Sequence, residues 1–314
     1  MDEIANRTGS AVDAAVAVGR ELGLTVTDAV VLHDLFSVVV HLAPAPVVAR
    51  IPVVLSPTTD LATLARRQRA ELDVARWLNE QGTPVIPPSP LVPLEPVQRE
   101  GFSMTFWQFV VEDRDKEPDY VANSERTADL HAALRGYPGE LSFLSSAEPR
   151  FVTESLALLQ DRPDLIDPSD LDRARREWRV LAPFVRSRDA FEARFPGIDV
   201  QPIHGDSPPA NIFNGTAGDL YSDFELVTLG PVEWDLAALG PDLEAAYNRG
   251  ARRNGMRPLD DEVLRFVNAV GVLRAIAVLT LSPQLPALVE FLQPLIDQWH
   301  DLPFAGGLDG FVTR

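Results

Sequence analysis

A short segment of the chain, residues 203–225, gathers side chains that hold a hard cation or accept a proton. It reads IHGDSPPANIFNGTAGDLYSDFE, and its three candidate reactive groups are Asp206, Asn211 and Asp223. Carboxylate and amide oxygens are the ligands that Mg²⁺ prefers, and a positioned carboxylate also serves as a general base. Four residues separate Asp206 from Asn211, and the prolines among them stiffen the loop. The segment therefore predicts a proton-accepting group next to a magnesium site.

The second half of this segment predicts a β-hairpin. The dipeptides Asn-Gly and Gly-Asp at residues 214–215 and 218–219 are turn signals, so residues 211–213 are expected to pair with residues 221–223. A turn centred near Ala217 places Asn211 directly opposite Asp223. Two hard oxygen ligands then meet at one end of the hairpin, as a magnesium ion that bridges phosphates requires. An ordinary hairpin with solvated acidic edges is the alternative.

A second candidate pair lies nearer the N-terminus. In the helix expected over residues 60–80, Leu64, Ala75 and Leu78 fall on the same face as Glu71. A buried carboxylate needs a cationic partner, and Arg50 on the preceding strand is the best candidate. The alternative is a glutamate at the edge of a helix face.

Composition excludes several classes of protein. The chain has 314 residues, a formal net charge of −18 and no cysteine. The absence of cysteine rules out disulfides, thiolate metal sites and cysteine nucleophiles. A strongly acidic chain is unsuited to nucleic acid, so no nucleic-acid partner is expected. The N-terminal residues lack a secretory pattern, and apolar runs such as residues 275–281 are too short to span a membrane. A soluble, cytoplasmic protein is expected.

These residues require elements that position them. Short valine-rich runs predict strands over residues 29–32, 37–42 and 47–54, and residues 10–22 and 60–80 predict helices. Residues 101–111 predict a further strand, which runs into the charged stretch Glu112–Asp119. We place the domain boundary there, with an N-terminal lobe over residues 1–110 and a C-terminal lobe over residues 111–314. The expected fold is α+β, with a small antiparallel sheet followed by a larger, mainly helical part.

The ordered motifs of the chain resemble those of the aminoglycoside phosphotransferase and choline kinase type of small-molecule kinases. The matching residues are His204-Gly205-Asp206, Asn211, Asp223-Phe224-Glu225, Gly230-Pro231 and Trp234-Asp235-Leu236-Ala237. Weaker resemblance extends through Glu71-Leu72, residues 104–110 and Leu130-His131, so it covers most of the chain. The resemblance implies a bilobal, protein-kinase-like fold and transfer of a phosphoryl group from ATP or GTP to a hydroxyl of a small molecule.

The resemblance also implies roles for matched residues of the C-terminal lobe. Asp206 is expected to be the catalytic base, and Asn211 and Asp223 are expected to hold Mg²⁺. Glu225 is expected to support the metal site. The resemblance assigns His204 and Asp235 a structural role, with Asp235 bracing the catalytic loop.

In the N-terminal lobe, the resemblance implies that Arg50, fixed by Glu71, contacts the phosphates of the nucleotide. The end of the strand at residues 107–110 is the expected hinge, where backbone groups meet the purine and Phe109 is a candidate contact. No glycine occurs between Gly23 and Gly82, so the turn at residues 33–37 must replace a glycine-rich loop, with Ser37 as a phosphate contact.

Arg50 stands where kinases of this type have lysine. Arg50 and the missing glycines leave open a degenerate protein that binds nucleotide without transfer. A metal-dependent phosphoesterase that uses water as the acceptor is a further alternative. The acceptor pocket is expected in the helical lobe, where acidic residues after Trp234 suit an aminoglycoside, an amino sugar or another aminated metabolite. A solvated helical face and neutral hydroxyl compounds remain open, as does the oligomeric state.

Overall fold

The computed structural model describes residues 2–308 and 310, and its chain forms two compact units. One unit comprises the chain up to Pro118 together with Asn211–Glu225. The other comprises Asp119–Ala210 together with the chain from Leu226 onward. The hairpin segment, which we expected within a C-terminal lobe of residues 111–314, thus clusters with the N-terminal residues. The division of function between a nucleotide-binding and an acceptor-binding lobe stays a prediction.

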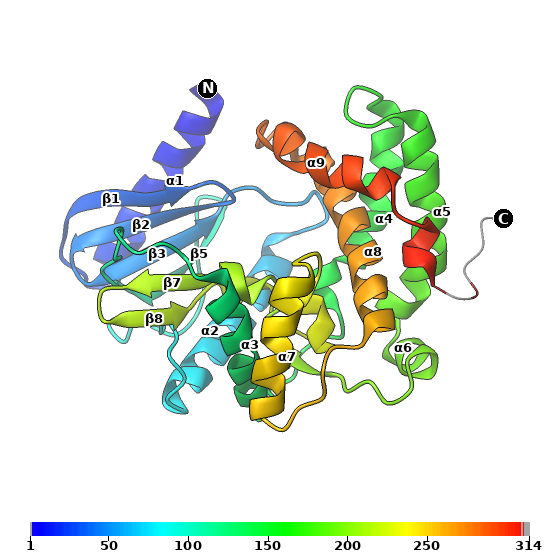
Figure 1. Ribbon diagram of the computed structural model, residues 1–314. Coiled ribbons are helices and arrows are strands. Elements are labelled where there is room, and N and C mark those ends of the chain that lie inside the picture. Colours follow the sequence, from blue (N-terminus) through cyan, green and yellow to red (C-terminus); the bar gives the residue numbers. More distant parts are fainter. Residues whose placement is uncertain (1, 309, 311–314) are drawn as a thin grey trace. The chain divides into compact units, whose positions relative to one another are not determined.

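The first unit is built on a five-stranded antiparallel sheet (Figure 1), in the order β1-β2-β3-β5-β4. Its strands are β1 (Val26–Asp34), β2 (Ser37–Pro44), β3 (Val47–Pro52), β4 (Val97–Arg99) and β5 (Phe102–Gln108). Valine-rich strands favour this pleated arrangement because branched side chains pack well on a half-buried sheet. The strands expected over residues 29–32, 37–42, 47–54 and 101–111 are confirmed, with small differences at their ends.

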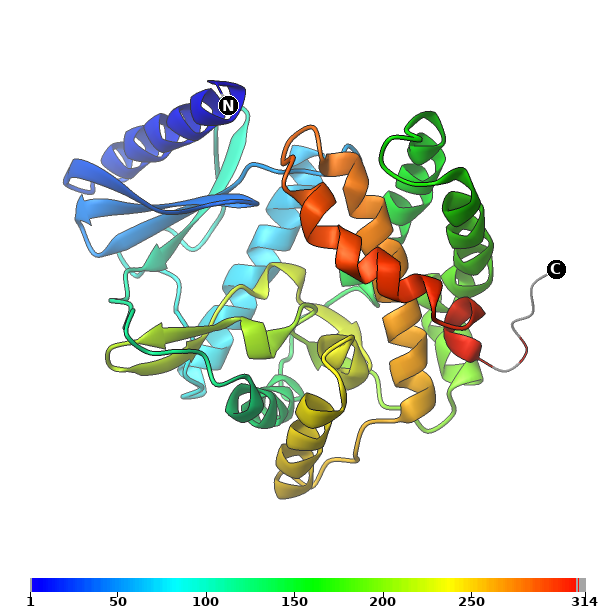
Figure 2. The same cartoon turned by 45° about the horizontal axis from the view of Figure 1, so that its top comes forward.

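Two helices complete the first unit. Helix α1 (Asp2–Glu21) packs along β1 and β2 (Figures 1 and 2) through the small side chains Ala11, Ala14 and Ala15. Helix α2 (Leu61–Glu80) packs against β5 and begins at Asp60, whose carboxylate accepts from the amide of Thr63. This side-chain cap satisfies an amide that the helix itself leaves unpaired. Both expected helices are confirmed, although α1 begins earlier than residue 10.

The hairpin β7 (Ile212–Gly215) and β8 (Gly218–Tyr221) is fastened to the first unit through backbone hydrogen bonds. The amide of Tyr221 donates to Pro84 O, and Tyr221 O accepts from Ile86, at 2.8 and 2.9 Å. The amide of Asp113 donates to Asn214 O at 2.8 Å. These bonds explain why the hairpin and the charged stretch after residue 111 both belong to the N-terminal unit.

The second unit is mainly helical, with one small two-stranded sheet. Its helices are α3 (Tyr120–Leu134), α4 (Pro149–Leu158), α5 (Pro168–Arg186), α6 (Arg188–Arg194), α7 (Pro241–Arg253), α8 (Asp261–Val278) and α9 (Leu288–His300). The sheet pairs β6 (Gln201–Ile203) with β9 (Thr228–Gly230). The short 3₁₀ helices of the chain are η1 (Ser145–Ala147), η2 (Leu159–Asp161), η3 (Pro208–Ala210), η4 (Phe224–Leu226), η5 (Val232–Leu236), η6 (Leu279–Leu281) and η7 (Phe304–Gly307).

Helix α8 is the core helix of the second unit. It packs against α4, α5 and α9 (Figure 1), and Phe266, Val270 and Ile276 on it are fully buried. Residues 261–281 are long and apolar enough to cross a membrane by length and composition, which we did not expect from the apolar runs alone. Because 61% of the most apolar window is buried by the protein, its packing accounts for its composition.

Candidate active site

Arg50 on β3 is the centre of a charged cluster within the first unit. Its Nη1 lies 3.3 Å from Glu71 Oε1, and its Nη2 lies 2.8 Å from Asp223 Oδ1 and 2.5 Å from Glu225 Oε2. The Arg50–Glu71 pair predicted from the helix periodicity is confirmed. The contacts of Arg50 with Asp223 and Glu225 were not predicted. The guanidinium of Arg50 therefore bonds to Glu71, the other half of the candidate nucleotide-binding pair, and to Asp223 and Glu225 of the candidate metal site.

The carboxyl group of Glu71 is buried. Glu71 is 1% exposed, and Leu64, Ala75 and Leu78 on the same helix face are also buried. Its Oε2 accepts no hydrogen bond from the described part of the chain. Burial raises the pKa of Glu71 to about 8, with Asp223 and Glu225 adding to the rise and Arg50 opposing it. Glu71 therefore holds its proton up to about pH 8, mainly because its carboxyl group is buried and secondly because two further carboxylates share its guanidinium.

Burial alone lowers the pKa of Arg50, but Asp223, Glu225 and Glu71 outweigh it, so the net pKa lies above the ordinary arginine value. Arg50 stays charged as a result. The side chains of Asp223 and Glu225 are 36% and 34% exposed, whereas that of Arg50 is 12% exposed. The cluster thus presents carboxylate oxygens to solvent around a buried cation, and its acidic groups outnumber its basic one.

The hairpin register differs by one residue from the expected register. The strands pair Ile212 with Tyr221 and Gly215 with Gly218, so the turn contains two residues and is not centred on Ala217. Asn211 consequently lies beside Ser222, whose amide and hydroxyl both donate to Asn211 O, at 3.0 and 2.9 Å. The expectation that Asn211 lies directly opposite Asp223 was wrong. Two-residue loops are the commonest hairpin connections.

Asp223, the residue after Ser222, has a positive φ of 62°. Few non-glycine residues adopt this left-handed conformation, although aspartate tolerates it better than most. Local strain of this kind persists where surrounding contacts hold the backbone in place. Here the conformation directs the Asp223 carboxylate to Arg50 at 2.8 Å.

The donor set suits a cation that takes few protein ligands. Among the described residues, no group of three or more His, Cys, Asp and Glu side chains is arranged as a complete metal site. Mg²⁺ keeps several waters and binds through one or two carboxylates together with phosphate oxygens. Asp223 and Glu225 supply two hard carboxylates that already bond to one cationic nitrogen. The side chains therefore fit Mg²⁺ bound jointly with a phosphate-bearing ligand.

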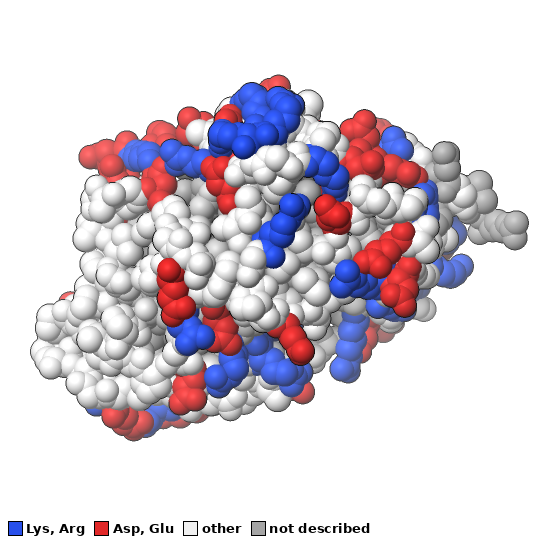
Figure 3. Space-filling view, turned by 90° about the horizontal axis from the view of Figure 1, so that it is seen from below, with Lys and Arg blue, Asp and Glu red and all other residues white. Residues whose placement is uncertain are grey.

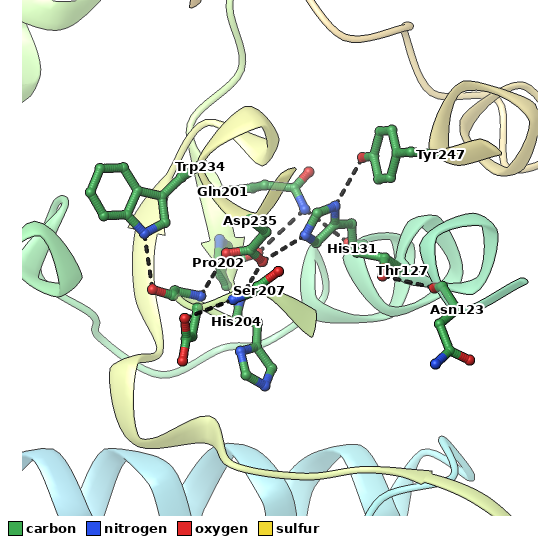
Figure 4. A network of polar contacts seen from close by, with 12 residues as sticks. Asn123, Thr127, His131, Gln201, Pro202, His204, Ser207, Trp234, Asp235 and Tyr247 are labelled. Atoms are coloured by element: carbon green, nitrogen blue, oxygen red, sulfur yellow. Dashed lines mark hydrogen bonds and ion pairs between the residues drawn. The ribbon is translucent and has the colours of Figure 1, made fainter. Parts of the chain in front are cut away.

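The loop that carries Asp206 belongs to the second unit, and Asn211 is the first residue of the following segment, which belongs to the first unit. Asp206 is exposed, and its Oδ1 accepts from the amide of Ser207 at 2.9 Å. Behind it, Asp235 Oδ2 accepts from the amide of His204 and Oδ1 from that of Gly205, both at 2.8 Å (Figure 4). Asp235 thus braces the loop, as expected.

Gly205 permits the loop to pass close to the end of η4. Its φ is +88°, and a Cβ atom there would lie 1.8 Å from the carbonyl oxygen of Leu226. The indole Nε1 of Trp234 donates to Gly205 O at 2.9 Å, and the side chain of Asn123 donates to Pro209 O at 3.0 Å. His204 itself is fully buried. The backbone before and after Asp206 is therefore fixed at several points, while its carboxylate remains accessible.

The remaining predicted site residues lie in the first unit without a defined ligand contact. Ser37 begins β2 and is 5% exposed. Phe109 stacks on His41 with a centroid separation of 3.8 Å, and its amide donates to Pro46 O. This amide is therefore occupied within the protein. The roles of Ser37 and Phe109 in nucleotide binding remain predictions.

Two residues of the network behind Asp206 were not predicted as site residues. His131 Nε2 lies 2.9 Å from Asp235 Oδ2, and His131 Nδ1 lies 2.9 Å from the hydroxyl of Tyr247 (Figure 4). The resemblance at Leu130-His131 was a signal for His131. Helix pattern does not single it out, because the buried face of α3 also carries Asn123, Ser124 and Thr127.

Comparisons with known proteins concern the fold and the family of the chain. No similar sequence was found among curated proteins. Three solved structures share the fold: amicoumacin kinase hAmiN in complex with AMP-PNP, Ca²⁺ and Ami, a choline/ethanolamine kinase family protein from Mesorhizobium loti, and aminoglycoside phosphotransferase APH(3'')-Id from Streptomyces rimosus. The amicoumacin kinase is 14% identical to this chain, with a TM-score of 0.61, and the match covers 98% of both chains. The Mesorhizobium loti protein is 14% identical, with a TM-score of 0.58, and the match covers 95% of this chain and 96% of that one. The Streptomyces rimosus enzyme is 18% identical, with a TM-score of 0.53, and the match covers 85% of this chain and 98% of that one.

These similarities establish the fold, which is the expected protein-kinase-like α+β fold. The family relationship follows from a separate observation. Residues 37–275 match the model of the family described as "Phosphotransferase enzyme family", and this range includes every predicted site residue. The chain belongs to the phosphotransferase enzyme family.

Proposed function

We propose that this phosphotransferase moves the γ-phosphoryl group of ATP or GTP to a hydroxyl of a small aminated molecule, with Mg²⁺ as its cofactor. The observation that carries the proposal is the Arg50 cluster, which joins Glu71 to Asp223 and Glu225 through one guanidinium. A cation adjoining accessible carboxylates is the arrangement that binding a metal–triphosphate complex requires.

On the donor side, Arg50 binds phosphate oxygens through its fork of N–H groups, and Glu71 fixes the direction of the fork. Asp223 and Asn211 are the proposed metal ligands, and Glu225 supports them. When bound, Mg²⁺ neutralises charge on the phosphate oxygens. Ser37 and Phe109 are proposed contacts of the phosphates and the base.

On the acceptor side, Asp206 orients the acceptor hydroxyl and receives its proton. The hydroxyl oxygen forms a bond to the γ-phosphorus as the bond from this phosphorus to the leaving oxygen breaks, and the nucleoside diphosphate departs. Asp235 keeps Asp206 in place without contacting the substrate. Positioning and electrostatics supply most of the catalysis in such a transfer.

The acceptor class rests on charge and on related proteins. The formal net charge of −18 favours a cationic compound. Solved structures of the same fold were determined with kanamycin and with streptomycin, both for aminoglycoside phosphotransferases. On helix α7, burial and the charge of Asp261 raise the pKa of Glu244, which lies among the acidic residues expected to receive an amine. An aminoglycoside, an amino sugar or another aminated metabolite is the proposed substrate.

The proposed setting is the cytoplasm, without a nucleic-acid or membrane partner. On the face in Figure 3, basic and acidic side chains are interspersed, which supports this proposal because nucleic-acid binding needs a cationic surface. The described residues offer no feature that favours the non-transferring or the phosphoesterase alternative over transfer.

The proposal is tested by following ³¹P NMR signals of Mg²⁺–ATP and Mg²⁺–GTP with a panel of aminated and neutral hydroxyl compounds. We expect a phosphomonoester product whose formation by Asp206→Asn is slower by about 100- to 10,000-fold. Asp199→Asn is the matched control, since Asp199 is exposed and lies in the same chain segment. Equal rates for wild type and Asp206→Asn would refute the assignment of the base.

A further inference from the structure

A continuous line of buried side chains leads from helix α7 to the loop of Asp206. The hydroxyl of Tyr247 on α7 lies 2.9 Å from His131 Nδ1 on α3, and His131 Nε2 lies 2.9 Å from Asp235 Oδ2 (Figure 4). Asp235 in turn accepts from the amides of His204 and Gly205, immediately before Asp206. Tyr247 and His131 are 0% exposed and Asp235 is 1% exposed.

The partners of Asp235 determine where the protons lie in this line. The Asp235 carboxylate can only accept hydrogen bonds, and it accepts two from backbone amides. In its third contact, with His131, the imidazole nitrogen must therefore be the donor. His131 therefore carries its proton on Nε2. In the neutral imidazole, Nδ1 then accepts a hydrogen bond, and its donor is the Tyr247 hydroxyl. Burial raises the pKa of Tyr247, with Glu233 and Asp235 adding to the rise, so the phenol keeps this proton.

Close packing of α3 and α7 holds the line at hydrogen-bonding distance. A Cβ atom at Gly250 on α7 would lie 2.1 Å from Glu125 O on α3, so only glycine permits this approach. Arg253 on α7 pairs with Glu125 and Asp129 on α3. The position of Tyr247 relative to His131 is therefore set by the contact of two helices.

We propose that His131 and Tyr247 are positioning residues of the phosphoryl transfer, which hold Asp235 in the orientation that fixes the backbone before Asp206. The proposal rests on the role proposed for Asp206. The hydroxyl of Tyr247 is buried and bonded to His131, so it serves the loop of Asp206. Removal of either side chain leaves a buried polar group without its partner and loosens the loop.

Steady-state kinetics at saturating acceptor test the proposal. We expect Tyr247→Phe to lower kcat about 10-fold and His131→Leu about 100-fold, with the KM for nucleotide unchanged, since small displacements of a catalytic group cost this much. His131→Gln retains an N–H donor for Asp235 and should recover most of the loss. Tyr120→Phe and His300→Leu, at exposed positions, are matched controls.

A double-mutant cycle tests whether Tyr247 acts through His131. In the His131→Leu background, Tyr247→Phe should have no further effect on kcat, because the hydroxyl no longer reaches Asp235 through the imidazole. Additive losses, wild-type kcat in Tyr247→Phe, or a change confined to the nucleotide KM would each overturn the proposal. Urea unfolding of every variant shows whether a loss of kcat follows from loss of the folded state.

A spectroscopic measurement tests the proton order without an activity assay. In ¹⁵N-histidine protein, which has five histidines, the signal absent from His131→Gln identifies His131. We expect the Nε2–H tautomer, and a changed Nδ1 shift in Tyr247→Phe. An Nδ1–H tautomer or an imidazolium would overturn the network. Lack of transfer by the wild type would refute the proposed function instead, so the two failures are distinguishable.

Discussion

The guanidinium of Arg50 lies 2.8 Å from the carboxylate of Asp223, although 172 positions separate the two residues in the chain. The contact joins the residue proposed to hold nucleotide phosphates to a residue proposed to hold the metal. A metal–nucleotide complex that binds as proposed would compete with these carboxylates for the guanidinium of Arg50.

Removal of Arg50 should destabilise the fold because the buried Glu71 loses its hydrogen-bond donor and Asp223 and Glu225 lose the cation with which they pair. We expect Arg50→Met to lower the free energy of unfolding by about 3 kcal/mol in urea titrations. The double variant Arg50→Met/Glu71→Met should recover part of the loss, since both buried polar groups are then gone. Arg114→Met, at an exposed site, is the control. An unchanged midpoint for Arg50→Met would contradict the importance of the cluster.

The raised pKa of Glu71 predicts a specific pH dependence of stability. The folded protein keeps the Glu71 proton up to about pH 8, whereas the unfolded chain loses it near the ordinary value of 4.5. Between these values the folded state binds more protons, so the free energy of unfolding falls as pH rises. Glu71 contributes its full stabilisation below pH 4.5 and loses up to about 5 kcal/mol towards pH 8.

Glu71→Gln isolates this contribution because it keeps the shape of the side chain and removes the titration. Urea unfolding at several pH values between 5 and 8.5, without divalent cations, should show a flatter pH dependence for Glu71→Gln than for the wild type. The same slope in both proteins would show that Glu71 does not hold its proton in the folded state.

Gly205 should be intolerant of even a small side chain. Its φ is +88°, and an added Cβ atom would lie 1.8 Å from Leu226 O. We expect Gly205→Ala to destabilise the protein by about 2–4 kcal/mol and to impair transfer by displacing Asp206. Gly23→Ala is a matched control, since Gly23 has the same φ but no atom near the added Cβ. Equal effects would show that backbone conformation alone accounts for the loss.

The sequence was most informative where a local rule decides the structure. Helix periodicity predicted that Glu71 is buried against a strand arginine, and the 3.3 Å contact with Arg50 confirms it. Turn dipeptides predicted the hairpin at residues 211–223, but not its register, because a one-residue change in the loop shifts every pair. The resemblance of ordered motifs predicted the fold class and the enzyme family.

Contacts between distant segments were beyond local rules. No pattern near Arg50 indicates that Asp223 and Glu225 share its guanidinium, because their positions depend on the hairpin being fastened to Pro84 and Ile86. For the same reason no local pattern indicates that the hairpin clusters with the N-terminal residues. The bond from His131 to Tyr247 depends on how closely α3 and α7 approach at Gly250, which only the packed structure shows.

The most direct test of the account is isothermal titration calorimetry of ATP and GTP, with and without Mg²⁺. It compares the wild type with Asp223→Ala and with Asp219→Ala, an acidic residue of the same hairpin that pairs with Lys116. We predict magnesium-dependent binding of at least one nucleotide to the wild type and Asp219→Ala, and its loss in Asp223→Ala. Absence of binding to the wild type, or undiminished magnesium-dependent binding to Asp223→Ala, would contradict the proposed donor site.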